Sequence, residues 1–141
     1  VWEGVYHMTP GPNNAHGFVE DELTVLLLPY ARAAGLFSSG QFNLGEPDDY
    51  RVPDGGYHRE RLAGARVRTA AIVVVIVSPG DETYEKFGFY AAHGVDELLV
   101  ADPDARTVLM WKLTVGKYQA TSSSSLLNVS AAVLTDAIDW P

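Results

Sequence analysis

The residues of this sequence that could do chemistry are mainly carboxylates, and they gather around one apolar stretch, Ile72–Val77. They are Asp54, which follows Pro53 ahead of the stretch, and Asp81, Glu82, Glu85 and Lys86, which follow directly after it. Carboxylate oxygens are ligands that hard divalent cations prefer. Structural alternatives exist: a Pro-Asp pair is common in turns, and Lys86 can pair with Glu82 on a helix surface.

Several other kinds of site are excluded by composition and motif. Cysteine is absent, which excludes disulfides, thiolate metal sites and a cysteine nucleophile. The sequence has no Gly-rich phosphate loop, no nucleophile elbow and no zinc motif. His7, His58 and His93 have no metal-ligand spacing among themselves.

The apolar stretch itself predicts a strand that is buried on both faces, because Ile72–Val77 consists of β-branched residues only. Ser78-Pro79-Gly80 ends the strand. A helix is expected from about Glu82 to His93, with Asp81 or Thr83 as its cap and Gly94 as its stop. A buried strand that leads directly into a helix is typical of an α/β domain, where sites often lie at strand ends.

The remaining elements follow from periodicity and turn residues. Apolar spacing predicts a first helix over about Ala15–Ala34, with a kink or interruption at Pro29. Ser130 can cap a final helix, Ala131–Ile138. Expected strands are Trp2–Met8, Gln41–Leu44, an extended segment Tyr50–Asp54 that Gly55–His58 can continue, Val95–Ala101 and Val108–Leu113. Residues 121–125 are expected to form a polar linker. This order predicts an α/β fold with a mixed sheet flanked by helices.

Length and composition place the chain among soluble globular proteins. At 141 residues, with 47% hydrophobic and 20% charged residues, it is expected to form a single domain over 1–141. No apolar run approaches the length of a membrane span, and no signal peptide is evident. We therefore expect a cytoplasmic protein with no membrane partner. The sequence begins with Val1 rather than Met, so its start could have been trimmed.

The net charge of −8 opposes non-specific binding to phosphate backbones, yet half of the basic residues lie close together. These five are Arg51, Arg59, Arg61, Arg66 and Arg68. They form either a solvated loop or a basic rim beside a phosphate-binding site.

Motifs along almost the whole chain resemble one nuclease family. They are the opening Trp2–Met8, the stretch Phe42–Asp54 ending in Pro53-Asp54, then 78–86, 89–97 and Asp102-Pro103, and the closing Asp139-Trp140-Pro141. In this order and spacing they resemble the Uma-type restriction endonucleases of the PD-(D/E)XK nuclease superfamily.

The resemblance implies a restriction-endonuclease-like fold, a homodimer, and DNA cleavage that depends on Mg²⁺, with Mn²⁺ as the other candidate. It assigns Asp54 as metal ligand and catalytic residue, and Lys86 as the catalytic lysine. The second carboxylate of the pattern falls at position 75, which is Val75 here. Valine cannot coordinate a cation, so we expect weakened metal binding and impaired cleavage. Asp81, Glu82 or Glu85 could complete a rearranged site.

The resemblance also makes two residues of the first helix candidates for the site. His16 occupies a position where the family often has histidine, and either approaches the site or has a capping or packing role. Glu20 is either an acidic group of the site or part of a solvated helix face. The alternative to an impaired nuclease is a non-catalytic module that binds nucleic acid through Arg51, Arg59 and Arg61, or binds a protein partner.

Overall fold

The computed structural model describes residues 14–80 and 82–141. The expected strand Trp2–Met8 and the possible cap Asp81 lie outside the described residues. The first element is helix α1 (Asn14–Ala33) and the last is helix α3 (Ala131–Ala137). Between them, a short helix α2 (Phe87–Ala92) follows the 3₁₀ turn η1 (Tyr84–Lys86). The strands are β1 (Phe37–Ser39), β2 (Leu44–Glu46), β3 (Asp49–Arg51), β4 (Gly55–His58), β5 (Ile72–Ile76), β6 (Glu97–Asp102), β7 (Thr107–Thr114), β8 (Lys117–Thr121), β9 (Ser123–Ser124) and β10 (Val129–Ser130).

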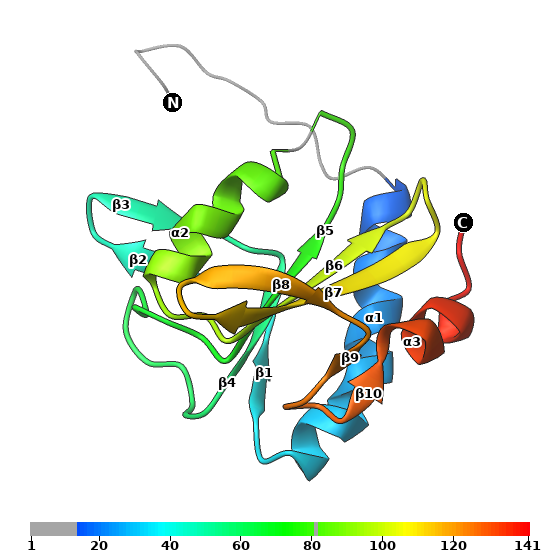
Figure 1. Ribbon diagram of the computed structural model, residues 1–141, viewed down its shortest axis with the longest axis horizontal. Coiled ribbons are helices and arrows are strands. Elements are labelled where there is room, and N and C mark those ends of the chain that lie inside the picture. Colours follow the sequence, from blue (N-terminus) through cyan, green and yellow to red (C-terminus); the bar gives the residue numbers. More distant parts are fainter. Residues whose placement is uncertain (1–13, 81) are drawn as a thin grey trace.

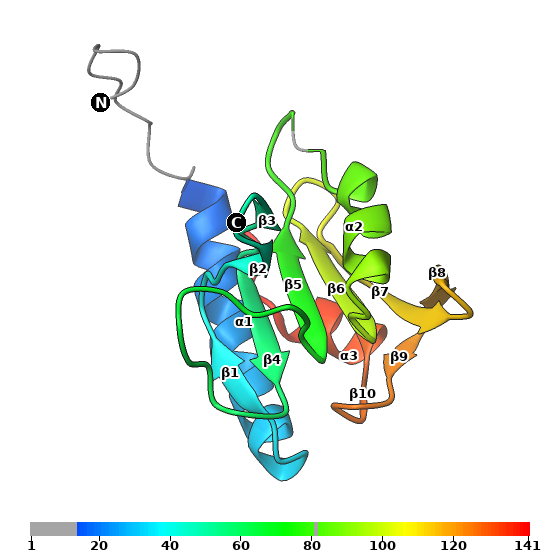
Figure 2. The ribbon, with the colours of Figure 1, turned by 90° about the vertical axis from the view of Figure 1, so that its left-hand side faces the viewer.

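The main sheet has the strand order β1-β4-β5-β6-β7-β8. Strands β5 and β6 are parallel, and the other neighbouring pairs are antiparallel. Helix α1 lies on one face of this sheet and α2 on the other (Figures 1 and 2). The predicted α/β fold with a mixed sheet flanked by helices is therefore confirmed.

Strand β5 is buried on both faces, as its β-branched sequence predicts. Ile72, Val74 and Ile76 pack in the cluster that includes the buried side of α1. Val73 and Val75 pack in the opposite cluster, toward α2. Because successive side chains of a strand point to opposite faces, this one strand joins both halves of the core.

Helix α1 buries Val19, Leu23, Leu27 and Ala31, which recur at four-residue spacing along one face. The expected interruption at Pro29 does not occur, since the helix continues to Ala33. Pro29 and Val25, four residues earlier, are both exposed, so the missing hydrogen bond falls on the solvent side of the helix.

Several other local expectations differ from the structure. The expected helix Glu82–His93 begins as the 3₁₀ turn η1, and Thr83 makes no side-chain capping bond there. The expected strand Gln41–Leu44 is replaced by β1 and by the hairpin β2–β3. The expected polar linker 121–125 contains β9, and β8 was not predicted. Ser130 does cap α3, accepting a hydrogen bond from the Val133 N–H at 3.1 Å.

Candidate metal centre

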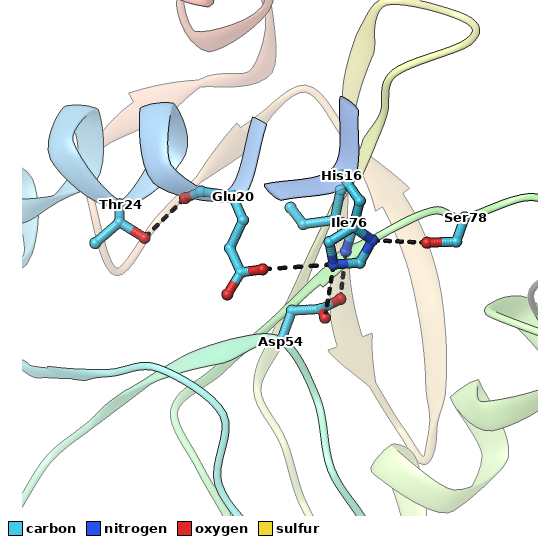
Figure 3. Close-up of polar contacts among 6 residues, drawn as sticks. All are labelled: His16, Glu20, Thr24, Asp54, Ile76 and Ser78. Atoms are coloured by element: carbon cyan, nitrogen blue, oxygen red, sulfur yellow. Dashed lines mark hydrogen bonds and ion pairs between the residues drawn. The ribbon is translucent and has the colours of Figure 1, made fainter. Parts of the chain in front are cut away.

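Asp54 is held at the end of the β4–β5 pair by the backbone. The antiparallel register pairs Gly55 with Val74, so the ladder between the two strands stops just before Asp54. Beyond the last ladder pair, the Asp54 side chain takes the place of a backbone acceptor: its Oδ2 accepts a hydrogen bond from the Ile76 N–H at 2.8 Å. This bond satisfies a backbone donor and fixes the orientation of the carboxylate, leaving Oδ1 directed toward α1 (Figure 3).

Helix α1 brings His16 and Glu20 to this carboxylate. The two residues are one turn apart and therefore lie on the same helix face. The Nε2 atom of His16 lies 3.1 Å from Asp54 Oδ1 and 3.4 Å from Glu20 Oε2 (Figure 3). His16 is buried, with 9% of its surface exposed, while Glu20 and Asp54 are partly buried. One ligand atom of each residue lies within 4.8 Å of the other two.

The other ring nitrogen of His16 contacts the end of β5. Its Nδ1 lies 2.6 Å from Ser78 Oγ. Ser78 is the second residue after β5 and is partly buried. The end of β5 thus holds Asp54 through the Ile76 N–H and His16 through a side chain.

The electrostatics of this cluster favour a bound positive charge. Partial burial raises the pKa of Glu20, and the nearby Asp54 carboxylate raises it further, although contact with His16 opposes this. Two carboxylates that face one point are stabilised by a proton or a metal ion between them. The donor set fits a divalent cation, because it supplies two carboxylate oxygens and one imidazole nitrogen.

Val75 lies beside Asp54 in the register but contributes no ligand. Continuing the ladder past Gly55 and Val74 places position 75 across from Asp54. The Val75 side chain is 6% exposed and packs in the apolar cluster that contains Val73 and Tyr90. At this position the chain has an apolar contact where the family pattern has a carboxylate.

Lys86 comes from the opposite face of the sheet. It ends η1 and immediately precedes α2, whereas His16 and Glu20 come from α1 (Figure 2). Glu82 and Glu85, two of the possible substitute ligands, are exposed, and the third, Asp81, lies outside the described residues. Of the alternatives to a carboxylate at position 75, the contacts around Asp54 favour Glu20.

The arginines do not gather around Asp54. Arg59 directly follows the far end of β4, and a strand that rises ~3.4 Å per residue places it roughly 17 Å from Asp54. Arg61 comes two residues later in the chain. Arg59 pairs with Asp96 at 2.6 Å, and Arg61 lies over the Phe37 ring at 4.8 Å. Arg51 pairs with Asp49 at 2.8 Å. A pocket of about 310 Å³ at this far end is lined in part by His58, Arg59, Arg61, Arg68 and Thr69.

Sequence reasoning left the roles of two of the three cluster residues open. A capping or packing role for His16 agreed equally well with the sequence, and for Glu20 the sequence favoured a solvated helix face over a site role. The signal that could have selected the site is the four-residue spacing of a histidine and a glutamate on the helix face that buries Val19 and Leu23. Ser78 was interpreted only as the end of a strand.

Comparisons with known proteins concern the family and the fold of the chain. The model of the family described as "Uma2: Putative restriction endonuclease" matches residues 2–137. A crystal structure from Anabaena variabilis, described as a putative nuclease belonging to DUF820, superposes with a TM-score of 0.72 at 15% sequence identity. The alignment covers 96% of this chain and 88% of that one, and shows a shared fold. Among curated proteins, none matches the chain.

Proposed function

Because the chain belongs to the Uma2 family of putative restriction endonucleases, we propose that it is a metal-dependent nuclease that hydrolyses phosphodiester bonds, with DNA as its substrate. The observation that carries this proposal is the convergence of His16, Glu20 and Asp54, with one ligand atom from each within 4.8 Å of the others. Within the described residues 14–80 and 82–141, this is the one such group of acidic and histidine side chains.

His16, Glu20 and Asp54 would hold a divalent ion, which when bound would supply an activated water and neutralise charge on the phosphoryl oxygens. The chain's own residues prepare the place for it. The Ile76 N–H holds Asp54 so that Oδ1 is presented to the cluster, and burial on α1 holds the His16 ring. Glu20 adds the second carboxylate. Lys86, which comes from the side of α2, is the group that we propose to stabilise phosphate charge, and its support is the family resemblance alone.

The donor set favours Mn²⁺ over Mg²⁺ in this proposal. Mg²⁺ demands oxygen ligands in near-ideal octahedral geometry. Imidazole suits transition-metal ions, while carboxylates suit Mn²⁺ as well as Mg²⁺. A site with one imidazole and two carboxylates is therefore better matched by Mn²⁺.

We expect the activity to be low because position 75 holds no carboxylate. Glu20 reaches the cluster from another element and is partly exposed, with 33% of its side-chain surface accessible. An exposed carboxylate attracts a cation less strongly, because solvent screens its charge. Val75→Glu would restore the family pattern, and an increase in cleavage would show that the missing carboxylate limits the activity.

The test is cleavage of plasmid DNA with Mg²⁺ or Mn²⁺ by the wild type and by Asp54→Asn. Asp48→Asn is the matched control, because it removes the same charge from an exposed position in the same segment. We expect slow cleavage, faster with Mn²⁺, that Asp54→Asn abolishes and Asp48→Asn leaves unchanged. Cleavage by Asp54→Asn at the wild-type rate would contradict the proposed site.

The second candidate is a module that binds nucleic acid without cutting it, through Arg51, Arg59 and Arg61. Its support is the arginine-lined pocket at the far end of β4. Binding of labelled DNA should then fall steeply with salt, and more steeply for the wild type than for Arg61→Ala. Arg61 is the variant of choice because Arg59 is engaged by Asp96 and Arg51 by Asp49. Absence of binding at low salt would exclude this function.

Two further expectations from the sequence stay predictions. The first is a homodimer, which the molar mass from light scattering tests. The second is a cytoplasmic location, which cell fractionation tests. Among the described residues, no helix has the length and apolar character to cross a bilayer.

A further inference from the structure

We propose that Ser78 is a positioning residue that lets His16 change tautomer when a metal ion enters the cluster. This inference rests on the proposed function of the cluster. It starts from the fact that the two ring nitrogens of His16 face different chemistry. Nε2 faces the carboxylates of Asp54 and Glu20, and Nδ1 faces the Ser78 hydroxyl at 2.6 Å.

The carboxylates fix what Nε2 must do in each state. Ionised carboxylates only accept hydrogen bonds. Without a cation, Nε2 therefore serves best as an N–H donor toward Asp54, at 3.1 Å. With a cation between the carboxylates, Nε2 must instead present its lone pair, and the single proton of the neutral ring then resides on Nδ1.

Ser78 can match both arrangements because a hydroxyl is both a donor and an acceptor. When Nδ1 lacks a proton, the Ser78 O–H donates to it. When Nδ1 carries the proton, the Nδ1–H donates a hydrogen bond to Ser78 Oγ. Rotation of one O–H bond interconverts the two, so the ring keeps a hydrogen bond in either state. A group that only donates or only accepts would favour one tautomer.

The surrounding structure fixes the backbone on both sides of Ser78. The preceding residue, Val77, donates its N–H to the Ala101 carbonyl at 2.8 Å, which extends the β5–β6 pairing to the neighbour of Ser78. Pro79 follows and restricts the backbone of Ser78 to extended conformations. The hydroxyl is thus presented just beyond the end of a central strand, where the backbone is still held by the sheet.

The first measurement is Mn²⁺ affinity by electron paramagnetic resonance for the wild type, Ser78→Ala and Ser78→Thr. Partners of a metal-bound histidine typically contribute 10–100-fold to affinity. We expect Ser78→Ala to bind Mn²⁺ about 10-fold more weakly and Ser78→Thr, which keeps the hydroxyl, to bind as the wild type does. Equal affinity of Ser78→Ala and the wild type would overturn the inference, as would equal losses in Ser78→Ala and Ser78→Thr.

The second measurement reads the hydrogen bond directly. In ¹⁵N-histidine-labelled protein loaded with diamagnetic Zn²⁺, the His16 signal is identified by its loss in His16→Gln. We expect a proton on Nδ1 that exchanges slowly in the wild type and Ser78→Thr, and rapidly in Ser78→Ala. A proton on Nε2 in the Zn²⁺-loaded wild type would overturn the inference.

The outcomes separate this inference from the function on which it rests. Mn²⁺ binding that is lost in Asp54→Asn but unchanged in Ser78→Ala would overturn the role of Ser78 and leave the metal site in place. A wild type that binds no Mn²⁺ would overturn both. Thermal unfolding of each variant without metal shows whether a lost affinity reflects a lost fold.

Discussion

Glu20→Gln should separate the stability of the metal-free fold from its capacity to bind a cation. Glutamine has nearly the shape of glutamate and keeps an oxygen that can accept from His16 Nε2, now 3.4 Å from Glu20 Oε2. It removes one of the two negative charges of the cluster. Because burial and the Asp54 charge both raise the pKa of Glu20, the ionised side chain is disfavoured in the folded protein.

The expected effect on the metal-free protein is a small gain in stability at neutral pH. Glu20 is partly exposed, so the gain should stay below about 1 kcal/mol, the scale of such charge interactions. A carboxyl whose pKa is raised on folding contributes stability at low pH that is lost as the pH rises through the folded pKa. The gain of Glu20→Gln should therefore be absent below pH 4.5, the ordinary pKa of a glutamate side chain.

The effect on the metal-loaded protein should have the opposite sign. A ligand at 100 times its dissociation constant stabilises the fold by about 2.7 kcal/mol. For a chain of this length, at roughly 2–4 °C per kcal/mol, this raises the melting temperature by about 5–10 °C. Glu20→Gln should lose most of this increase because it replaces one of the three ligands.

The assay is thermal unfolding by circular dichroism with and without Mn²⁺ at pH 7 and pH 4. Asp21→Asn is the control, since it removes a charge from the adjacent, exposed position of α1. It should keep the full Mn²⁺ effect. A Glu20→Gln protein that melts well below the wild type without metal, or that keeps the wild-type response to Mn²⁺, would refute the reasoning.

Three further predictions concern groups that stabilise the fold. Glu97→Ala should lower the free energy of unfolding by roughly 3–5 kcal/mol in urea titrations. The reason is that the buried carboxylate accepts hydrogen bonds from Ser124 Oγ and from two backbone N–H groups. Glu85→Ala, at an exposed position, should change the free energy of unfolding little. Stability should fall as the pH drops below about 6.5, because burial lowers the pKa of His58 and the unfolded chain then binds more protons. Denaturant midpoints at pH 7.5 and 5.5 measure this loss, and His58→Gln should reduce it. Gly45→Ala should lower the melting temperature, since this glycine has φ +132° and an added Cβ would lie 2.5 Å from a backbone oxygen; Gly40→Ala meets no atom within 4 Å and should be near neutral. Equal melting temperatures for these two variants would contradict the close packing of the β2–β3 hairpin.

Local sequence signals predicted the elements that dominate the core. The β-branched run at 72–76 is buried on both faces, the four-residue spacing of Val19, Leu23 and Leu27 marks α1, and Ser130 caps α3. These signals are strong because each depends on residues close together in the chain. Prediction was weaker for the strands β8 and β9. β8 is joined to the predicted strand β7 by the two-residue turn Val115-Gly116, in which both residues have positive φ. Valine is an unusual residue at such a position, so the turn signal was weak.

The candidate site was decided by tertiary structure. The sequence identified Asp54 through a family pattern and showed that position 75 has no carboxylate. It could not show that α1 delivers His16 and Glu20 to Asp54, because that contact spans 38 residues and depends on how a helix packs across a sheet. Nor could it show that Arg59 and Arg61 lie at the opposite end of β4 from Asp54. The pairing of β4 with β5 decides which end of the strand is near the site. Composition and periodicity fix which residues are buried, whereas register and packing fix which polar atoms meet.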